Sequence, residues 1–552
     1  MNMLPLGGLG RVARVISLVM LGYWALFALL APVMTVDSQM YNLARIHLAA
    51  EGGLFGNALF TSVFHVIMPW GFDAVHLPFL YLGWGFALPS FACLGGICFV
   101  AHRMIRDRFG PDAAWVAVLG LLGLTCLVYQ GTSTKNDIPL VFAGAVWIYA
   151  RWRWRREGGA AHLFWMVLAV GFMSGVKTTG VPFAALLGLW TLWQVRRQRR
   201  VLGGVLAGLL FAGVLFGSVE TYVETWRIYR DPLGPETVAG PLRNRDGMAG
   251  AAANLSRYFA RGVYWGPTTG RDGPAVVAWW SGVERSLLKV AGLSDRGASP
   301  QFRDGELFLF QSGQEELSGY GPGGTWAVGI LLLACVWIRP RRVWWRLSAG
   351  AWCVFGTLSL AVAYTDWANR YVLGGYVLAI CAVVCLLWER DGPVARVARG
   401  IFFVIAAVGA IGAPLGSHNR GPRALADCLV ARERLETSAF PLAGAVRAKL
   451  RELKQERPDS RVYFVVCNDS VILPLMEDRR IDPILATPPT FAVWLASGEV
   501  RAGDLVIEDY SVALDRLSAL EKVIAPDAFS ADGVRSQIIY RVVGAGATSA
   551  TQ

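Results

Sequence analysis

The sequence predicts a polytopic α-helical membrane protein that ends in a small α/β domain. Of its 552 residues, 54% are hydrophobic and only 17% are charged, whereas soluble proteins carry about 25% charged residues. The apolar residues fall in blocks of about 15 to 25, close to the roughly 20 that a helix needs to cross the hydrocarbon core of a membrane. Residues 417–552 lack these blocks and return to the pattern of a globular domain.

Eleven apolar blocks predict about eleven spanning helices. They cover residues 12–34, 79–101, 113–129, 137–150, 162–176, 179–195, 201–218, 325–338, 345–364, 371–388 and 399–416. The first block is too long and too weakly basic at its front for a cleaved signal peptide, so we expect it to be the first spanning helix.

The arginines predict the orientation of these helices. The net charge is +12, and the basic residues gather in five short connections: 102–108, 151–156, 196–200, 339–346 and 389–399. Positively charged loops stay in the cytoplasm, which explains the net charge without a nucleic-acid partner. We therefore expect a bacterial inner-membrane protein with a cytoplasmic N-terminus and a periplasmic C-terminal domain.

Two domains follow from this pattern. Residues 1–416 form the transmembrane domain, which includes a long outer loop at 219–324, and residues 417–552 form a soluble α/β domain. In the latter, residues 461–467, 504–509 and 536–543 read as strands and 510–524 as a helix. The domain carries no phosphate-binding glycine motif and no metal motif, so we expect it to pack or to dock an acceptor.

The cysteines divide in the same way. Seven lie inside apolar blocks, where cysteine behaves as a small hydrophobic residue. Cys428 and Cys467 lie in the hydrophilic region and can pair if that region is outside the cytoplasm.

Ionisable residues collect at the outer ends of the predicted helices. They are Asp37, Asp73, His76, Lys135, Asp137, Lys177, Asp366 and Arg370. A charged side chain costs about 2.5 to 3.5 kcal/mol at the centre of a spanning helix, so these residues are expected to form a polar cavity at one membrane face. Carboxylates there can accept a proton or bind a divalent cation such as Mg or Mn, and lysine and arginine can neutralise a phosphate.

Each residue also has a simpler interpretation. Asp37 can cap a short interfacial helix whose apolar side includes Leu43, Ala44 and Leu48. Asp137 can be a favourable helix-start residue, and Lys177 can extend to the membrane interface. Arg370 and Tyr371 can form an interfacial anchor pair. Their common position on one side of the membrane favours a functional role.

Four segments resemble the GT-C superfamily of integral-membrane glycosyltransferases, which includes protein O-mannosyltransferases and bacterial aminoarabinose transferases. They are the aspartate after the first helix, "STKNDIPLVF", "SGVKTTG" and "WANRYVL". The resemblance covers residues 12–416 and is strongest in the first half. It implies inverting transfer of a sugar from a polyprenyl-phosphate-linked donor to a lipid, glycan or protein acceptor on the periplasmic face.

The resemblance also assigns roles to residues. It makes Asp37 the general base and places Asp137 in the same cavity, where the two can hold a metal ion. Lys177 and Arg370 would contact the donor phosphate, Lys135 and Tyr371 would line the same substrate site, and Tyr41 and Arg45 would line the face that carries Asp37. Several members have paired acidic residues in the first loop, whereas Ser38 follows Asp37 here. Glu315 and Glu316 resemble an acidic motif of some bacterial members.

Three alternatives remain open at this point. A transporter or flippase for lipid-linked sugars predicts ionisable residues near the middle of the bilayer, and the sequence has few. A surface-polysaccharide polymerase or ligase would use arginines of the long outer loop, namely Arg243, Arg245, Arg257 and Arg261. A non-enzymatic scaffold leaves the one-sided cluster to chance.

Overall fold

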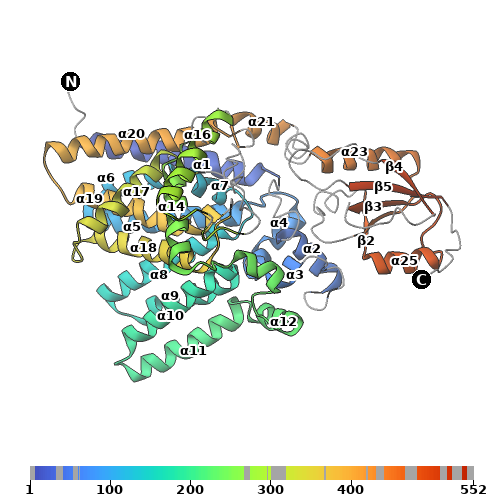
Figure 1. Cartoon of the computed structure of the whole chain (residues 1–552), viewed down its shortest axis with the longest axis horizontal. Coiled ribbons are helices and arrows are strands. Elements are labelled where there is room, and N and C mark those ends of the chain that lie inside the picture. Colours follow the sequence, from blue (N-terminus) through green and yellow to red (C-terminus); the bar gives the residue numbers. More distant parts are fainter. Residues whose placement is uncertain are drawn as a thin grey trace. The chain divides into compact units, whose positions relative to one another are not determined.

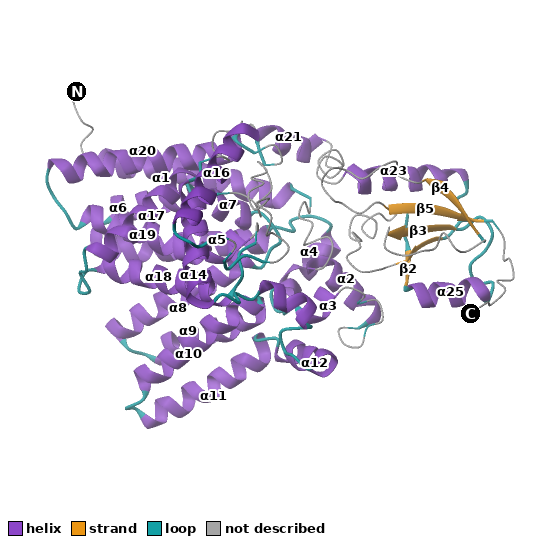
Figure 2. Ribbon diagram, viewed as in Figure 1, coloured by secondary structure: helices purple, strands orange, loops and turns teal. Residues whose placement is uncertain are grey.

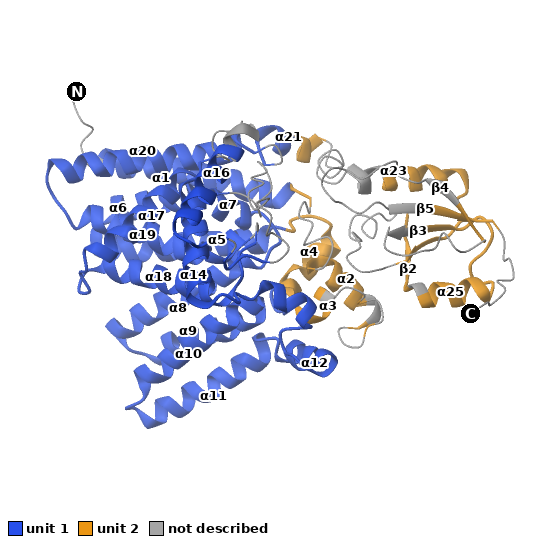
Figure 3. Cartoon of the chain, in the orientation of Figure 1, with its two compact units in different colours: residues 1–30, 69–72, 87–426 blue, residues 31–68, 73–86, 427–552 orange. Residues whose placement is uncertain are grey.

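The chain forms two compact units in the computed structural model (Figure 3). The structure describes residues 6–32, 42–53, 57, 60, 63–265, 274–294, 296–299, 319–365, 368–417, 420–430, 441–465, 481–509, 519–524 and 537–543. Unit 1 comprises residues 1–30, 69–72 and 87–426, and unit 2 comprises residues 31–68, 73–86 and 427–552. Most of the predicted first outer loop therefore groups with the C-terminal domain.

Unit 1 is a bundle of helices (Figures 1 and 2). Its helices include α1 (Leu6–Leu30), α5 (Leu88–Phe109), α6 (Pro111–Leu122), α7 (Thr125–Gly131), α8 (Asp137–Glu157), α9 (Ala160–Val176), α10 (Val181–Val195), α11 (Arg199–Phe216), α17 (Gly321–Val336), α18 (Val343–Ala361), α19 (Leu373–Trp388) and α20 (Pro393–Leu415). It also contains η3 (Thr178–Gly180), α12 (Val219–Tyr229), α13 (Glu236–Ala239), η4 (Gly240–Leu242), α14 (Gly247–Val263), α16 (Pro274–Val290) and η6 (Ala368–Val372), and it ends at Ala426 within α21 (Pro422–Val430).

The described helices make the chain an integral membrane protein, although they do not confirm the predicted count of eleven. Five are long and apolar enough to span a membrane: Gly8–Leu30, Leu88–Phe109, Arg199–Phe216, Ala368–Trp388 and Pro393–Leu415. Helices α6 and α7 would add a sixth span if their bent pair counts as one, and Ala160–Val176 and Gly321–Val336 are shorter apolar helices.

The break between α6 and α7 falls inside a block that the sequence presents as one helix. The two helices meet at an angle of 79°. At the break, a Cβ on Gly123 would lie 2.9 Å from the carbonyl oxygen of Ala406 in α20. Close contact with α20 therefore requires glycine at this position.

Unit 2 combines the short helices of residues 31–68 and 73–86 with an α/β domain. Its elements are α2 (Leu43–Gly52), α3 (Val63–Ile67), η2 (Asp73–His76), α4 (Leu77–Leu82), α23 (Pro441–Glu456), β1 (Val462–Val465), β2 (Ile484–Ala486), α25 (Pro488–Ala496), β3 (Leu505–Asp509), β4 (Leu520–Ile524) and β5 (Gln537–Val542). The strands form one sheet in the order β2-β1-β3-β5-β4. Strand β1 is parallel to β2 and β3, whereas β5 is antiparallel to β3 and β4.

The three predicted strands are present in this sheet, but the helix predicted over 510–524 is wrong at its end. Residues Leu520–Ile524 form the edge strand β4, which pairs with β5 through Glu521 and Arg541. Residues 510–518 lie outside the described part. Pairing with a neighbouring strand has overridden the local helical pattern.

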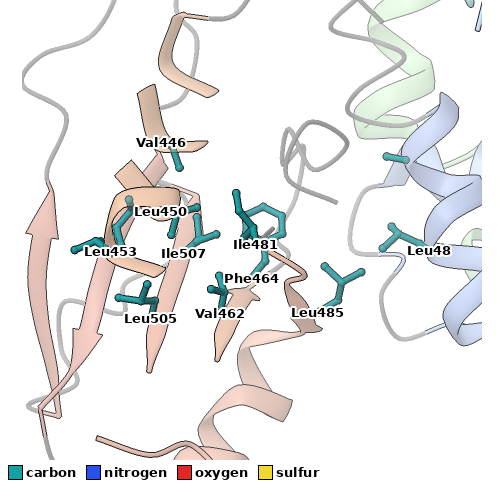
Figure 4. Packing of buried hydrophobic residues seen from close by; sticks show 12 residues of the cluster. Leu48, Val446, Leu450, Leu453, Val462, Phe464, Ile481, Leu485, Leu505 and Ile507 are labelled. Atoms are coloured by element: carbon teal, nitrogen blue, oxygen red, sulfur yellow. The ribbon is translucent and has the colours of Figure 1, made fainter. Parts of the chain in front are cut away.

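A hydrophobic core holds unit 2 together (Figure 4). Val446, Leu450 and Leu453 of α23 pack with residues of β1 and β3. Ala44 and Leu48 of α2 belong to the same buried cluster, and Leu43 packs with Phe86. The apolar side of α2 therefore faces protein, not the membrane surface that the simpler interpretation of Asp37 requires.

Candidate active site

Asp137, Lys177 and Arg370 form a buried ionic cluster in unit 1. Lys177 Nζ donates a hydrogen bond of 2.6 Å to Asp137 Oδ1, and Arg370 Nε lies 3.4 Å from Asp137 Oδ2. The side chains are 3% exposed for Asp137, 10% for Lys177 and 7% for Arg370. Lys177 and Arg370 thus share the carboxylate of Asp137, although Arg370 is 233 positions away from it in the sequence.

The turn before α8 places Asp137 at the start of that helix. Thr132 Oγ1 donates to the Val128 carbonyl at 3.0 Å, and Ser133 Oγ donates to the Gln130 carbonyl at 3.1 Å. These bonds bind the turn to the end of α7. Asp137 is the first residue of α8, where the helix dipole stabilises a negative charge.

A break between α9 and α10 directs Lys177 toward the cluster. Helix α9 ends at Val176, and Lys177 has extended backbone angles of φ −160° and ψ 146°. The next residues form η3, and α10 then begins with a proline in its first turn. Gly180 allows this tight connection, because a Cβ there would lie 2.2 Å from the carbonyl oxygen of Met173.

Aromatic residues surround the cationic side of the cluster. Lys177 Nζ lies 4.4 Å from the centroid of the Tyr371 ring, and Arg370 Cζ lies 5.6 Å from it. Such cation–π contacts orient the two cations. The Tyr320 hydroxyl donates to the carbonyl of Asn369 in η6, and its ring stacks on Tyr376 at 3.6 Å.

Lys135 adds a further positive charge to this region. Its side chain is 1% exposed, and its charge acts favourably on the Asp137 carboxylate. Burial of an ion costs several kcal/mol unless it is paired. The buried carboxylate of Asp137 and the cations Lys135, Lys177 and Arg370 therefore form a preorganised ionic site at the start of α8.

Five of the predicted site residues are thus brought together: Lys135, Asp137, Lys177, Arg370 and Tyr371. Lys177 is buried in an ion pair, so the interpretation as a side chain that extends to the interface does not describe it. Asp37, Tyr41, Glu315 and Glu316 lie outside the described residues, as do Asp366 and Cys467. Their roles, and a Cys428–Cys467 bond, stay predictions.

Arg45 lies in unit 2 and binds protein groups there. Its Nη2 atom is 2.6 Å from Asp73 Oδ2, and Nη1 donates to the carbonyls of Met68 and His65. The side chain is buried. Arg45 therefore connects α2 to η2, and its predicted substrate role is untested.

Residues 219–324, which the sequence predicts as a long outer loop, contribute a second buried group. Arg257 and Arg261 of α14 are buried beside Tyr364, with Arg257 Cζ 5.5 Å from its ring centroid. Glu284 of α16 is 2% exposed, and neither of its carboxylate oxygens has a hydrogen-bond partner among the described residues. Burial raises the pKa of Glu284 to about 8, although the charges of Arg261 and Arg257 oppose this shift.

Arg243 and Arg245 differ from this buried pair. Arg243 forms ion pairs with Asp231 and Glu236, and Arg245 pairs with Glu236, all in partly or fully exposed positions. Exposed pairs contribute little to stability. Of the four arginines named for this loop, Arg257 and Arg261 of α14 are buried, whereas Arg243 and Arg245 are not.

The contacts of Asp137 fit a divalent metal ion poorly. Its two oxygens face Lys177 and Arg370, which a cation would have to displace. Within the described ranges, no three His, Cys, Asp or Glu side chains converge in a manner that could hold a metal. A site shared with Asp37 stays a prediction, because Asp37 is outside those ranges.

Comparison with known proteins shows which fold the chain has. Residues 67–219, which contain Lys135, Asp137 and Lys177, match the family model described as dolichyl-phosphate-mannose-protein mannosyltransferase. The crystal structure of ArnT from Cupriavidus metallidurans bound to undecaprenyl phosphate aligns with a TM-score of 0.55 and 15% sequence identity, over 98% of this chain and 99% of that chain. The chain therefore has the fold of this ArnT.

The apo structure of the same ArnT gives a second alignment to this chain. Its TM-score is 0.51 at 15% identity, over 96% of this chain and 97% of that chain. No curated protein matches the sequence. The resemblance to the GT-C superfamily is thereby confirmed from the family model and the fold.

Proposed function

We propose that the chain is a membrane glycosyltransferase that uses a polyprenyl-phosphate-linked sugar as its donor. The observation that carries the proposal is the buried Asp137–Lys177–Arg370 cluster within the GT-C fold. The match of residues 67–219 to a mannosyltransferase family and the undecaprenyl phosphate bound to ArnT support it. The transfer takes place on the periplasmic face of a bacterial inner membrane.

The cations of the cluster bind the donor phosphate. Lys177 and Arg370 supply N–H donors whose charge stabilises the phosphate oxygens, and Lys135 adds to the local positive potential. Asp137 holds Lys177 through the 2.6 Å hydrogen bond before the donor arrives. Donors that are already oriented stabilise the developing negative charge without reorganisation.

The chemistry is a displacement at the anomeric carbon. Asp37 accepts the proton of an acceptor hydroxyl, and the acceptor oxygen then attacks the anomeric carbon on the face opposite to the phosphate. The bond between that carbon and the phosphate oxygen breaks, and its electron pair leaves with the lipid phosphate. The product is a glycosylated lipid, glycan or protein with inverted configuration, and the sugar is a pentose or a hexose.

The mechanism requires no divalent cation at Asp137. The predicted Mg or Mn site at Asp37 and Asp137 would place a second positive ion beside Lys177 and Arg370. Coulomb repulsion between these charges opposes its binding. Lys177 and Arg370 supply the positive charge that a metal would bring to the leaving phosphate.

The test is sugar transfer by the full-length protein in lipid nanodiscs. Radiolabelled sugars on a panel of polyprenyl-phosphate donors are offered with candidate acceptors, and native protein is compared with Asp37→Asn and Asp137→Asn. Binding of undecaprenyl phosphate is measured in parallel by native mass spectrometry, because this step needs no acceptor.

We expect the native protein to transfer sugar and both variants to lose this activity. The control is Asp391→Asn, which changes a carboxylate that is 99% exposed. Transfer that persists unchanged in Asp37→Asn excludes that residue as the base. Absence of sugar transfer, combined with movement of donor lipid across liposomes, would replace the transferase with a flippase.

A further inference from the structure

The end of α8 opposite to Asp137 carries a dense cluster of arginines. Helix α8 has 21 residues from Asp137 to Glu157, so its ends are about 30 Å apart at 1.5 Å per residue. Its last turns contain Arg151, Arg153, Arg155 and Arg156, and the connection from α10 to α11 and the start of α11 contain Arg196, Arg197, Arg199 and Arg200. We call these eight residues the arginine platform.

Contacts join the two halves of the platform. Arg151 Nε donates to Gln194 Oε1 of α10 at 3.2 Å, and its guanidinium lies 4.9 Å from the ring centroid of Trp190. Trp154 of α8 packs with the buried cluster that contains Val195 and Val205 of α10 and α11. Both arginine-rich segments therefore lie at the same end of the α8–α11 group (Figure 1).

The platform has few acidic partners. Arg153 pairs with Glu157 at 2.7 Å, and Arg156 lies 3.9 Å from Asp107. In the part of the chain that the structure describes, no carboxylate lies within salt-bridge distance of Arg196, Arg197, Arg199 or Arg200, and all four are exposed. This surface retains a strong positive charge that a membrane anion can neutralise.

An exposed apolar surface adjoins the platform. Leu189 of α10 and Leu206 and Leu210 of α11 are 66%, 49% and 67% exposed. Trp190 and Trp193 lie between this surface and the arginines, and the Arg196 guanidinium is 4.2 Å from the Trp193 ring centroid. Tryptophan prefers the boundary between lipid acyl chains and headgroups. The exposed leucines are therefore expected at the level of the acyl chains, and the arginines are expected at the level of the lipid phosphates.

We propose that the arginine platform binds the headgroup of an anionic phospholipid. The acyl chains lie on the apolar surface of α10 and α11, and the phosphodiester lies against the exposed arginines. The adjoining apolar surface selects a lipid over free phosphate, which would gain nothing from Leu189, Leu206 or Leu210. This site is distinct from the donor site, because the length of α8 separates them, and it is independent of the proposed activity.

The experiment uses the full chain in nanodiscs of phosphatidylcholine with a minor fraction of phosphatidylglycerol. Native mass spectrometry counts the phosphatidylglycerol molecules that remain bound after release. The test variant replaces Arg197, Arg199 and Arg200 with glutamine. The control replaces Arg339, Arg341 and Arg342 with glutamine, which removes the same charge from the basic turn between α17 and α18. A third variant carries lysine at the three test positions.

We expect retention of phosphatidylglycerol to fall about 100-fold in the test variant, because each basic residue near an anionic lipid surface contributes about 1 kcal/mol. The control should change less than about twofold, because it leaves the arginine platform and the adjoining apolar surface intact. The lysine variant should keep most of the binding, because it keeps the positive charge. Millimolar inorganic phosphate should not displace the lipid. Equal losses in both glutamine variants, no preference over phosphatidylcholine, or displacement by phosphate would overturn the proposal.

Discussion

The two ends of helix α8 carry charge in opposite ways. At the first end, Asp137 is 3% exposed and lies within 3.4 Å of two cations. At the other end, Arg155 and Arg156 are exposed, and the nearest ion pair of Arg156 spans 3.9 Å. Buried charges are costly unless paired, whereas exposed arginines cost little. The comparison teaches that burial with opposite charge, not charge density, distinguishes a candidate reaction site from a membrane-contact surface.

The largest expected effect concerns the stability of the buried end. Replacement of Asp137 by alanine leaves Lys177 and Arg370 buried without their shared carboxylate, and loss of one partner in a buried pair costs about 3 to 5 kcal/mol. The measurement is the free energy of unfolding by SDS titration. Asp391→Ala is the matched control, because it removes an exposed carboxylate that lies 3.3 Å from Arg399. Equal losses of unfolding free energy in Asp137→Ala and Asp391→Ala would show that the buried carboxylate contributes no more to stability than the exposed one.

A smaller effect is expected on lipid-phosphate binding at the same end. Lys177→Met should weaken binding of undecaprenyl phosphate by about 10- to 100-fold, because a hydrogen bond to a charged group contributes about 1.5 to 3 kcal/mol. Lys289→Met, at an exposed position of α16, is the control. Lys177→Met could weaken binding either by removing a contact to the phosphate or by leaving the Asp137 carboxylate unpaired. The double variant Asp137→Asn/Lys177→Met removes that unpaired charge as well. Full affinity in the double variant would argue against direct contact between Lys177 and the phosphate.

The buried carboxyl of Glu284 makes the stability of the folded chain depend on pH. The pKa of Glu284 is about 8 in the folded chain, against 4.5 in its ordinary environment. The folded state therefore holds a proton that the unfolded state releases, and stability falls as pH rises from about 4.5 to 8, by a few kcal/mol at most. Thermal unfolding of native protein and Glu284→Gln across this range gives the difference. Parallel curves for the two proteins would contradict the assignment.

The smallest effect is expected from metal removal. Transfer should stay within about twofold after treatment with EDTA, because the neighbouring cations oppose a divalent ion at Asp137. The control is a mock-treated sample in the same nanodiscs. Loss of transfer that Mg or Mn restores would instead support the predicted site shared by Asp37 and Asp137.

The sequence predicted the region of the cluster because hydropathy and arginine placement both have a simple physical basis. A helix that crosses the membrane must be apolar, and basic turns mark one side, so Asp137, Lys177 and Arg370 were assigned to the other side before their contacts were known. The contacts themselves followed from no pattern. The shared carboxylate depends on the break before α10 and on η6, which are set by tertiary packing.

Other features depended on partners that are remote in the chain. Arg45 pairs with Asp73, which is 28 residues away, and the turn that brings them together has no strong sequence signal. Glu284 lies on an amphipathic helix whose buried side could be recognised only once α14 was in place. The break at Gly123 and the strand at Leu520–Ile524 have the same origin, since α20 and β5 determine them.

The most direct test of the central claim is an electron cryomicroscopy structure of the native protein in nanodiscs with undecaprenyl phosphate bound. The account predicts that the phosphate lies within hydrogen-bond distance of Lys177 Nζ and the Arg370 guanidinium, at the Asp137 end of α8. A phosphate bound elsewhere, with Lys177 still paired only to Asp137, would contradict it.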